Sequence, residues 1–139
     1  MISLDAGVLL ALTYPQHPQH ARVRDTLRAL PPSERFIVSP FAYAELMADP
    51  RRDTLSALLE GMKIRVLEEM PLSAYRSVGE ALQRTQETTQ EYAPLSLSCF
   101  IGAHALHHQI KLFTLEPERC RSLYPTLELL SLTESEVEV

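Results

Sequence analysis

Short runs of apolar residues alternate with longer amphipathic segments along this chain. Each run is only three or four residues long and is followed by a turn or by a residue that can start a helix, which is typical of buried strands in an α/β protein. The pattern predicts strands at 2–4, 36–38, 64–67, 112–114 and about 127–130.

The longer segments carry apolar residues at helical spacing, as Val23, Leu27 and Leu30 do on one face of a helix expected near 18–30. The sequence contains ten prolines, and they fall between the apolar-periodic segments. Because proline interrupts helix interiors and central strands, these positions mark the boundaries of elements. We expect further helices to start at or near residues 6, 39, 53, 73, 95 and 118.

Strands that alternate with helices predict an α/β fold, a three-layer α/β/α arrangement around a central, mostly parallel sheet of about five strands. With 139 residues, the chain is long enough for one domain that buries about two-thirds of its unfolded surface. We place this single domain at residues 1–132. Residues 133–139 contain three glutamates and are expected to form a frayed acidic tail.

The charge balance excludes binding of nucleic acid through overall positive charge. The formal net charge is −5, whereas nonspecific binding requires lysines and arginines to neutralise several phosphates. A polyanion would therefore have to be held by a local patch. Three groups of arginines are candidates, although a solvated surface is the simpler interpretation of each: Arg22, Arg24 and Arg28; Arg51 and Arg52; Arg119 and Arg121.

The sequence has no uninterrupted apolar stretch of about 18 residues, and no basic segment precedes the first apolar run. We therefore expect a soluble, cytoplasmic protein. The two cysteines, Cys99 and Cys120, lack the paired spacing of a metal site. In a reducing compartment they are expected to be free thiols.

Three acidic residues follow predicted strands. Asp5 comes directly after the first strand, Glu45 lies early in the helix after the second, and Glu116 lies two residues past the strand that ends at Thr114. Because ligands of open α/β sheets bind beyond the carboxyl ends of the strands, we expect these side chains to converge. Carboxylate oxygens are the ligands that Mg²⁺ and Mn²⁺ prefer. The sequence therefore predicts an acidic metal site at this edge of the sheet.

Four blocks of the sequence carry a family resemblance, in the correct order and nearly end to end. They are residues 2–10 (ISLDAGVLL), 39–46 (SPFAYAEL), 95–105 (LSLSCFIGAHA) and 114–116 (TLE), and residues 124–130 are similar to the last strand of the same family. The chain resembles the PIN domains, which include the VapC-type ribonuclease toxins of toxin–antitoxin pairs.

This resemblance implies a PIN-like fold and a divalent-metal-dependent endoribonuclease. Asp5 would be the central ligand of Mg²⁺ or Mn²⁺, and Glu45 and Glu116 would coordinate directly or through water. The ion would activate water and stabilise charge on the phosphate. The resemblance also implies RNA as substrate, a possible antitoxin partner and a homodimer.

The chain departs from the family at two places. Ser98 stands where the family has a third acid, and Ala6 and Gly7 replace the usual Thr-Asn pair. Because a serine offers only a neutral hydroxyl, we expect a weakened or inactive site, with Glu91 or Glu118 as conceivable replacements. Two alternatives follow: a catalytically inactive PIN-like module that binds RNA or protein and, less favoured, an unrelated α/β domain that binds a small molecule.

Each candidate residue also has a purely structural interpretation. Asp5 could cap the first helix, Glu45 could pair with an arginine in solvent, Glu116 could belong to an ordinary turn, and Ser98 could begin a helix. His104 and His108 are one helical turn apart, which permits a zinc site, but packed or solvent-facing histidines are the more common outcome. No specific role is expected for His17 and His20.

Overall fold

Five short strands and seven helices alternate along the part of the chain that the structure describes, residues 1–88 and 93–132 of this computed structural model. The expected tail at 133–139 lies outside these residues. In chain order the elements are β1 (Ile2–Leu4), α1 (Ala6–Thr13), α2 (His20–Arg28), β2 (Phe36–Val38), α3 (Pro40–Ala48), α4 (Arg52–Gly61), β3 (Arg65–Val66), α5 (Leu72–Thr88), α6 (Ala93–His107), β4 (Lys111–Phe113), α7 (Pro117–Leu123) and β5 (Leu129–Leu130).

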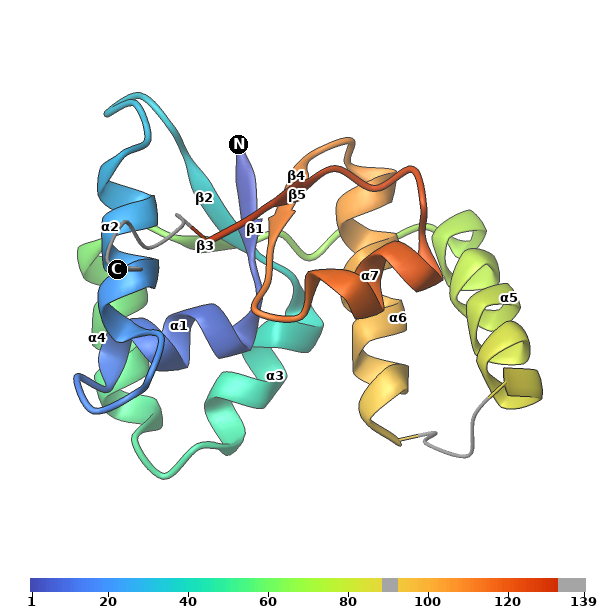
Figure 1. Ribbon diagram of the computed structural model, residues 1–139, viewed down its shortest axis with the longest axis horizontal. Coiled ribbons are helices and arrows are strands. Elements are labelled where there is room, and N and C mark those ends of the chain that lie inside the picture. The colour runs from blue at the N-terminus through green and yellow to red at the C-terminus, as the bar shows by residue number, and fades with distance from the viewer. Residues whose placement is uncertain (89–92, 133–139) are drawn as a thin grey trace, which may run out of the picture.

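The strands form one parallel sheet in the order β3-β2-β1-β4-β5 (Figure 1). In the middle strand, Ser3 pairs with Ile37 of β2 on one side and with Leu112 of β4 on the other. The predicted fold class is confirmed, and every strand pair is parallel. Both faces of such a sheet must be covered, which is why its strands read as short continuous apolar runs.

The helices cover the two faces of the sheet in two groups. Figure 1 shows α1 to α4 on one side and α5 to α7 on the other. From β1 the chain adds β2 and then β3 toward one edge of the sheet, whereas β4 and β5 lie on the other side of β1. Because connections between parallel strands are right-handed, this reversal sends the later helices to the opposite face. The switch point lies between β1 and β4, where a ligand site is expected.

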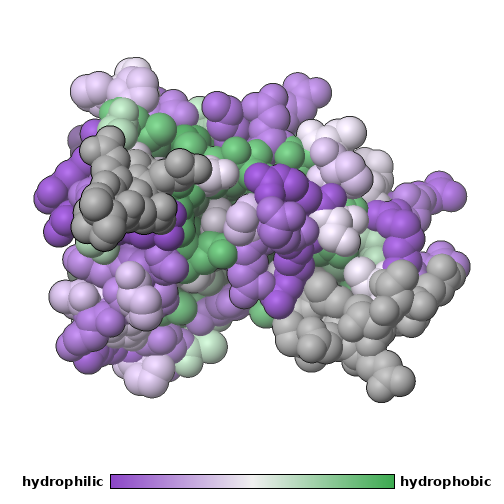
Figure 2. All heavy atoms as spheres, viewed as in Figure 1, coloured by the Kyte–Doolittle hydropathy of each residue, from purple (hydrophilic) through white to green (hydrophobic). Residues whose placement is uncertain are grey.

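The core sits around these central strands. Ile2, Leu4, Leu112 and Phe113 are at most 1% exposed. Fully burying a side chain of this size contributes about 1.5–3 kcal/mol. Figure 2 shows polar residues over most of the visible face, with hydrophobic residues mainly in the hollow between the two helix groups. No helix in the described ranges is long and apolar enough to cross a membrane.

Two helices begin where the sequence places a capping residue. The Oδ1 atom of Asp5 accepts a hydrogen bond of 2.8 Å from the backbone N–H of Ala6, and Ser39 Oγ accepts one of 3.1 Å from Ala42. Pro40 then occupies the first turn of α3, where its missing N–H costs nothing. These caps set the directions in which α1 and α3 leave the sheet.

The helix expected near residue 53 starts at Arg52, so Asp53 lies in its first turn and does not form the N-cap. Ser98 does not begin a helix either, because α6 starts at Ala93 and Ser98 is an interior residue. A proline is well tolerated in the first helical turn, so Pro94 lies within α6 rather than before it.

Helices α6 and α7 approach each other at Gly102. A Cβ atom placed there would lie 2.6 Å from Cδ2 of Tyr124, so a larger residue would displace the tyrosine ring. The Tyr124 hydroxyl donates a hydrogen bond of 2.7 Å to the carbonyl oxygen of Cys99, which fixes the ring. The contact therefore determines where α7 sits, and α7 carries part of the acidic cleft described next.

Candidate metal site in an acidic cleft

A cleft of about 370 Å³ lies beyond the carboxyl ends of β1 and β4. All three acids singled out in the sequence line it. We call it the acidic cleft, and its lining residues are Asp5, Gly7, His17, Glu45, Leu97, Ser98, Ile101, Thr114, Leu115, Glu116 and Arg119. Residues far apart in the sequence, from α1, α3, α6 and α7, therefore meet at the switch point of the sheet.

Asp5 is the most rigidly held of the acids. Its Oδ1 atom accepts a hydrogen bond from Ala6 N, and its Oδ2 atom accepts one of 2.8 Å from Thr114 Oγ1. Its own backbone N–H donates to the carbonyl oxygen of Phe113 at 3.0 Å. Thr114 in turn accepts a hydrogen bond of 3.1 Å from Glu116 N. The helix-cap interpretation of Asp5 is thus correct, and the same carboxylate faces the cleft.

The acids make one another harder to ionise. Burial is the main cause that raises the pKa of Asp5, opposed by the hydrogen bonds from Thr114 and Ala6. The pKa of Glu45 is also raised, first by burial and then by the negative charges of Asp5 and Glu116. Two carboxylates that resist ionisation beside a third are an arrangement that a bound cation would stabilise.

Glu116 is the most exposed of the three and already has a cationic partner. Its Oε2 atom lies 2.6 Å from Nη1 of Arg119, one helical turn further along α7. Its side chain is 56% exposed, and that of Arg119 is 30% exposed. Figure 2 shows hydrophilic residues over α7 in the middle of the view. The positive charge of Arg119 also lowers the pKa of Asp5, although less than burial raises it.

Position 98, where the family resemblance predicts a third acid, faces the cleft. Ser98 lines it from α6, so an acid there would join the other carboxylates. Glu118 does not compensate, since it is exposed, forms an ion pair with Arg121 and is not among the lining residues. Glu91 lies outside the described residues. The arginine-pair interpretation of Glu45 receives no support, because no arginine in the described ranges pairs with it.

The donor set suits a hydrated magnesium or manganese ion. In residues 1–88 and 93–132, no group of three histidine, cysteine or acidic side chains could hold a metal ion as it stands. Mg²⁺, however, keeps several water molecules and commonly uses only one or two carboxylates. Asp5 and Glu45 supply those, and both line the same cleft, where burial raises the pKa of each carboxyl group. The residues present therefore fit such an ion.

Two lining residues with titratable side chains, His17 and Arg119, were not predicted as part of the site. His17 belongs to a proline-rich turn, and its Nδ1 atom accepts a hydrogen bond of 3.0 Å from Gln19 N. No local sequence signal shows that this turn folds over the cleft. Arg119 had been noted only as part of a basic surface patch. Its spacing of three residues from Glu116 was the available signal, since residues three apart on a helix can pair.

His104 and His108 have structural partners. His104 is fully buried, and its Nε2 atom lies 2.6 Å from the carbonyl oxygen of Leu67. His108 Nε2 lies 2.7 Å from the carbonyl oxygen of Glu69. Both rings thus bind the segment that follows β3, which supports the packed interpretation over a zinc site.

Comparison with known proteins identifies the class of protein. A family model described as PIN domain matches residues 2–121, so the chain belongs to the PIN domain family. Ribonucleases of this family generally use divalent metals. A search of curated proteins found no match.

Solved structures with the same fold include toxin–antitoxin complexes. VapBC2 from Rickettsia felis, bound to a promoter DNA fragment, is similar with a TM-score of 0.69 and 16% identity, covering 96% of this chain and 100% of that one. VapBC-1 from nontypeable Haemophilus influenzae has a TM-score of 0.68 and 19% identity, with the same coverage. VapC20 of Mycobacterium tuberculosis, described as a toxin that cleaves the sarcin-ricin loop, has a TM-score of 0.60 and 17% identity over 81% of this chain and 87% of that one.

Proposed function

We propose that this protein is a divalent-metal-dependent endoribonuclease of the VapC toxin type whose activity is weakened by Ser98. The observation that carries the proposal is the convergence of Asp5, Glu45 and Glu116 on one cleft at the switch point of the sheet. Membership of the PIN domain family supports it, as does the likeness in fold to a toxin that cleaves RNA.

The three acids would divide the work according to how they are held. A bound Mg²⁺ or Mn²⁺ would supply water activation and stabilisation of charge on the phosphate. Asp5 would be the main ligand, because Thr114 and the first turn of α1 hold both of its oxygens in place. Glu45 would bind from α3, and Glu116 would act through water because it is the most exposed of the three.

Arg119 would have a second task when RNA enters the cleft. Its guanidinium group lies beside the carboxylates and carries the positive charge that a phosphate oxygen prefers. Arg119 would then pair with the phosphate in place of Glu116, and the Glu116 carboxylate would be available to the metal ion. Arg119 would therefore position the RNA backbone rather than take part in proton transfer.

The same proposal extends to protein partners. The similar solved structures include VapBC and FitAB assemblies, two of them bound to DNA. We infer that this chain also pairs with a small antitoxin protein and forms a homodimer. Co-expression with a candidate antitoxin, followed by size-exclusion chromatography with light scattering, tests both inferences. A chain that stays monomeric in the presence and absence of the antitoxin contradicts them.

RNA cleavage in the presence of Mn²⁺ tests the enzymatic proposal. Wild type should cleave a structured RNA slowly, and Asp5→Asn should abolish the cleavage, since an amide keeps the shape but not the charge of the ligand. Glu118→Gln is the matched control, because it removes a nearby charge that lies outside the cleft. Cleavage that persists in Asp5→Asn at the wild-type rate disproves the proposal.

A non-enzymatic PIN-like module that binds RNA or protein is the second candidate. It is favoured by Ser98 at the position of the third acid and by the Glu116–Arg119 ion pair, which partly neutralises the cleft without a metal. Calorimetry with Mn²⁺ separates the candidates. Binding that is lost in Asp5→Asn supports the enzyme, whereas no measurable binding to wild type supports the module.

A further inference from the structure

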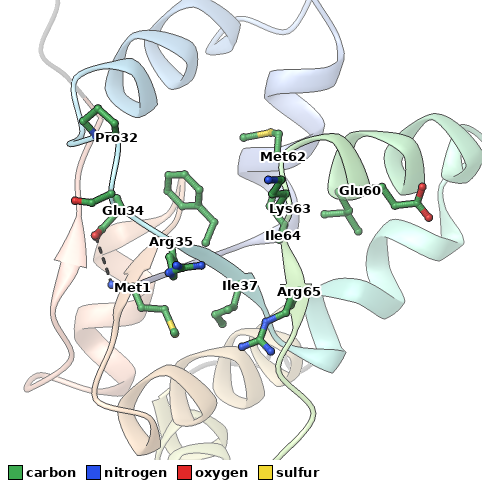
Figure 3. A pocket seen from close by; sticks show the side chains of 13 residues that line it. Met1, Pro32, Glu34, Arg35, Ile37, Glu60, Met62, Lys63, Ile64 and Arg65 are labelled. Carbon is green, nitrogen blue, oxygen red and sulfur yellow. Dashed lines mark ion pairs between the residues drawn. The ribbon is translucent and has the colours of Figure 1, made fainter.

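A second cavity lies at the opposite edge of the sheet, at the amino ends of β1, β2 and β3 (Figure 3). Its volume is about 720 Å³, compared with about 370 Å³ for the acidic cleft. Pockets for small ligands typically measure about 300–1,000 Å³. The cavity is therefore large enough for a small organic molecule, and the proposed nuclease chemistry does not use it.

Three cationic side chains line this cavity, and we call it the basic pocket. Arg35 directly precedes β2, Lys63 lies between α4 and β3, and Arg65 is the first residue of β3. All three are exposed, and none forms an ion pair with a carboxylate in the described part of the chain. Figure 3 shows them around the middle of the pocket.

The two acids in the lining do not cancel this charge. Oε1 of Glu34 lies 3.5 Å from the α-amino nitrogen of Met1, so Glu34 already has a cationic partner. The carboxylate of Glu60 points away from the three cations (Figure 3). The pocket consequently keeps an excess of positive charge that an anionic ligand could neutralise.

The backbone between α4 and β3 is fixed by two hydrogen bonds. The N–H of Lys63 donates to the carbonyl oxygen of Glu60 at 3.1 Å, and the N–H of Ile64 donates to that of Leu59 at 2.8 Å. These bonds satisfy two carbonyl groups at the carboxyl end of α4 and hold the backbone at Lys63 in place. Lys63 adopts the left-handed conformation that this ending requires, with φ of 56°.

Apart from Ser33, the remaining side chains of the lining are apolar. Ile37, Leu59 and Ile64 are buried, and Phe36 and Met62 are partly buried beside them. A ligand that fits this surface has an anionic group for the cations and a flat or apolar body for the wall. Planar bases stack on aromatic side chains and on arginine, and phosphates accept charge-assisted hydrogen bonds from arginine and lysine.

We propose that the basic pocket binds a nucleotide. Its phosphate lies at Arg35, Lys63 and Arg65, and its base lies against the wall formed by Phe36 and Met62. Three cations match a phosphate group, with its charge of nearly two and its several acceptor oxygens, better than they match a single carboxylate. The nucleotide is either free or the 5′-phosphorylated end of an RNA strand. The binding is independent of the nuclease activity proposed for the acidic cleft.

Calorimetry in EDTA tests this proposal with three probes: ADP, inorganic phosphate, and a 5′-phosphorylated single-stranded octaribonucleotide. The pair Arg35→Gln/Arg65→Gln should weaken binding of ADP at least ~10-fold, because charge-assisted contacts are lost. Lys63→Asn is a second variant that keeps a residue tolerant of the left-handed backbone. Arg52→Gln/Arg76→Gln is the matched control, since it removes two exposed charges outside the pocket.

The probes distinguish the source of the nucleotide. If ADP binds and its binding depends on Arg35 and Arg65, the ligand is a free nucleotide. If only the RNA binds in this way, the ligand is the 5′ end of an RNA strand. The proposal is overturned if neither ADP nor the RNA binds, or if the pocket variants bind these probes as tightly as the control variant does. It is also overturned if inorganic phosphate binds as tightly as ADP. Asp5→Asn, which lies outside the basic pocket, should bind ADP like wild type, so failure of the nuclease proposal does not affect this outcome.

Discussion

The two edges of the parallel sheet carry opposite charge. At the carboxyl edge, Asp5, Glu45 and Glu116 line one cleft, whereas at the amino edge Arg35, Lys63 and Arg65 line another cavity. In a parallel sheet every strand ends at the same edge, so the residues that follow strands meet at one side and those that precede strands meet at the other. The comparison shows how one topology can build two separate cavities of opposite charge.

The edges also differ in how their charges are held. Asp5 is fixed by hydrogen bonds from Ala6 and Thr114, and its burial makes ionisation costly. The cations of the basic pocket lie on long, exposed side chains that water still solvates. Preorganised, destabilised charge is typical of catalytic and metal sites, while flexible solvated charge is sufficient for binding an anion.

The largest expected effect comes from removing the acids one at a time. Losing even an outer partner of a metal site typically costs about 10- to 100-fold in metal affinity or activity, so Asp5→Asn should lower Mn²⁺-dependent cleavage by at least ~100-fold. Glu45→Gln should follow, and Glu116→Gln should have the smallest effect because that side chain is the most exposed. Single-turnover cleavage rates measure this order, and a larger loss in Glu116→Gln than in Asp5→Asn contradicts it.

The next largest effect is expected from a substitution that distorts only the acidic edge of the sheet. Gly102→Ala should lower the free energy of unfolding by about 1–3 kcal/mol, because the added Cβ overlaps the fixed ring of Tyr124. Gly79→Ala is the control in open space on α5, and it should raise the stability by about 0.5–1 kcal/mol. Urea denaturation measures both values. Equal stabilities of the two variants would show that α7 adapts freely to a larger residue at position 102.

Adding a carboxylate at position 98 should increase the difference in charge between the two edges of the sheet. Ser98→Asp places a further carboxylate on the lining of the cleft and should raise Mn²⁺ affinity by about 10-fold, the reverse of losing one ligand contact. Ser98→Asn is the uncharged control of the same shape. Calorimetric titration with Mn²⁺ gives the comparison, and equal affinities for the two variants contradict the assignment of position 98 to the site.

A smaller effect concerns pH. The pKa values of Asp5 and Glu45 are raised above their ordinary values of 3.8 and 4.5, so the folded, metal-free protein holds these protons more tightly than the unfolded chain does. Their contribution to stability is therefore greatest at low pH and falls as pH rises through the raised values. Urea denaturation from pH 4 to 7 in EDTA should show a shallower fall for Asp5→Asn. An unchanged pH dependence in that variant contradicts the raised pKa of Asp5.

Saturating Mn²⁺ should reverse this trend. Metal ligands bind in their deprotonated form, so metal affinity and the stability it adds increase with pH. The same denaturation series with Mn²⁺ in place of EDTA checks the reversal. Identical pH profiles in the two series would show that no ion binds at the acids.

The local pattern of residues determined the order and kind of most elements and the edge at which the acids lie. Apolar runs that end close to a proline can form only short strands. In a parallel sheet, the residues that follow such strands, here Asp5, Glu45 and Glu116, lie at the carboxyl edge. The prediction that Ser98 stands in place of an acid also came from the sequence, because it depends on one position in a recognisable block.

Tertiary structure alone decided the contacts between segments that are distant in sequence. The turn carrying His17 folds over the acidic cleft, and Arg119 of α7 lines that cleft together with residues of α1, α3 and α6. The basic pocket was not predicted at all, because Arg35 and Lys63 precede different strands and no motif links them. Side-chain packing and loop paths set these positions, and a local sequence pattern contains neither.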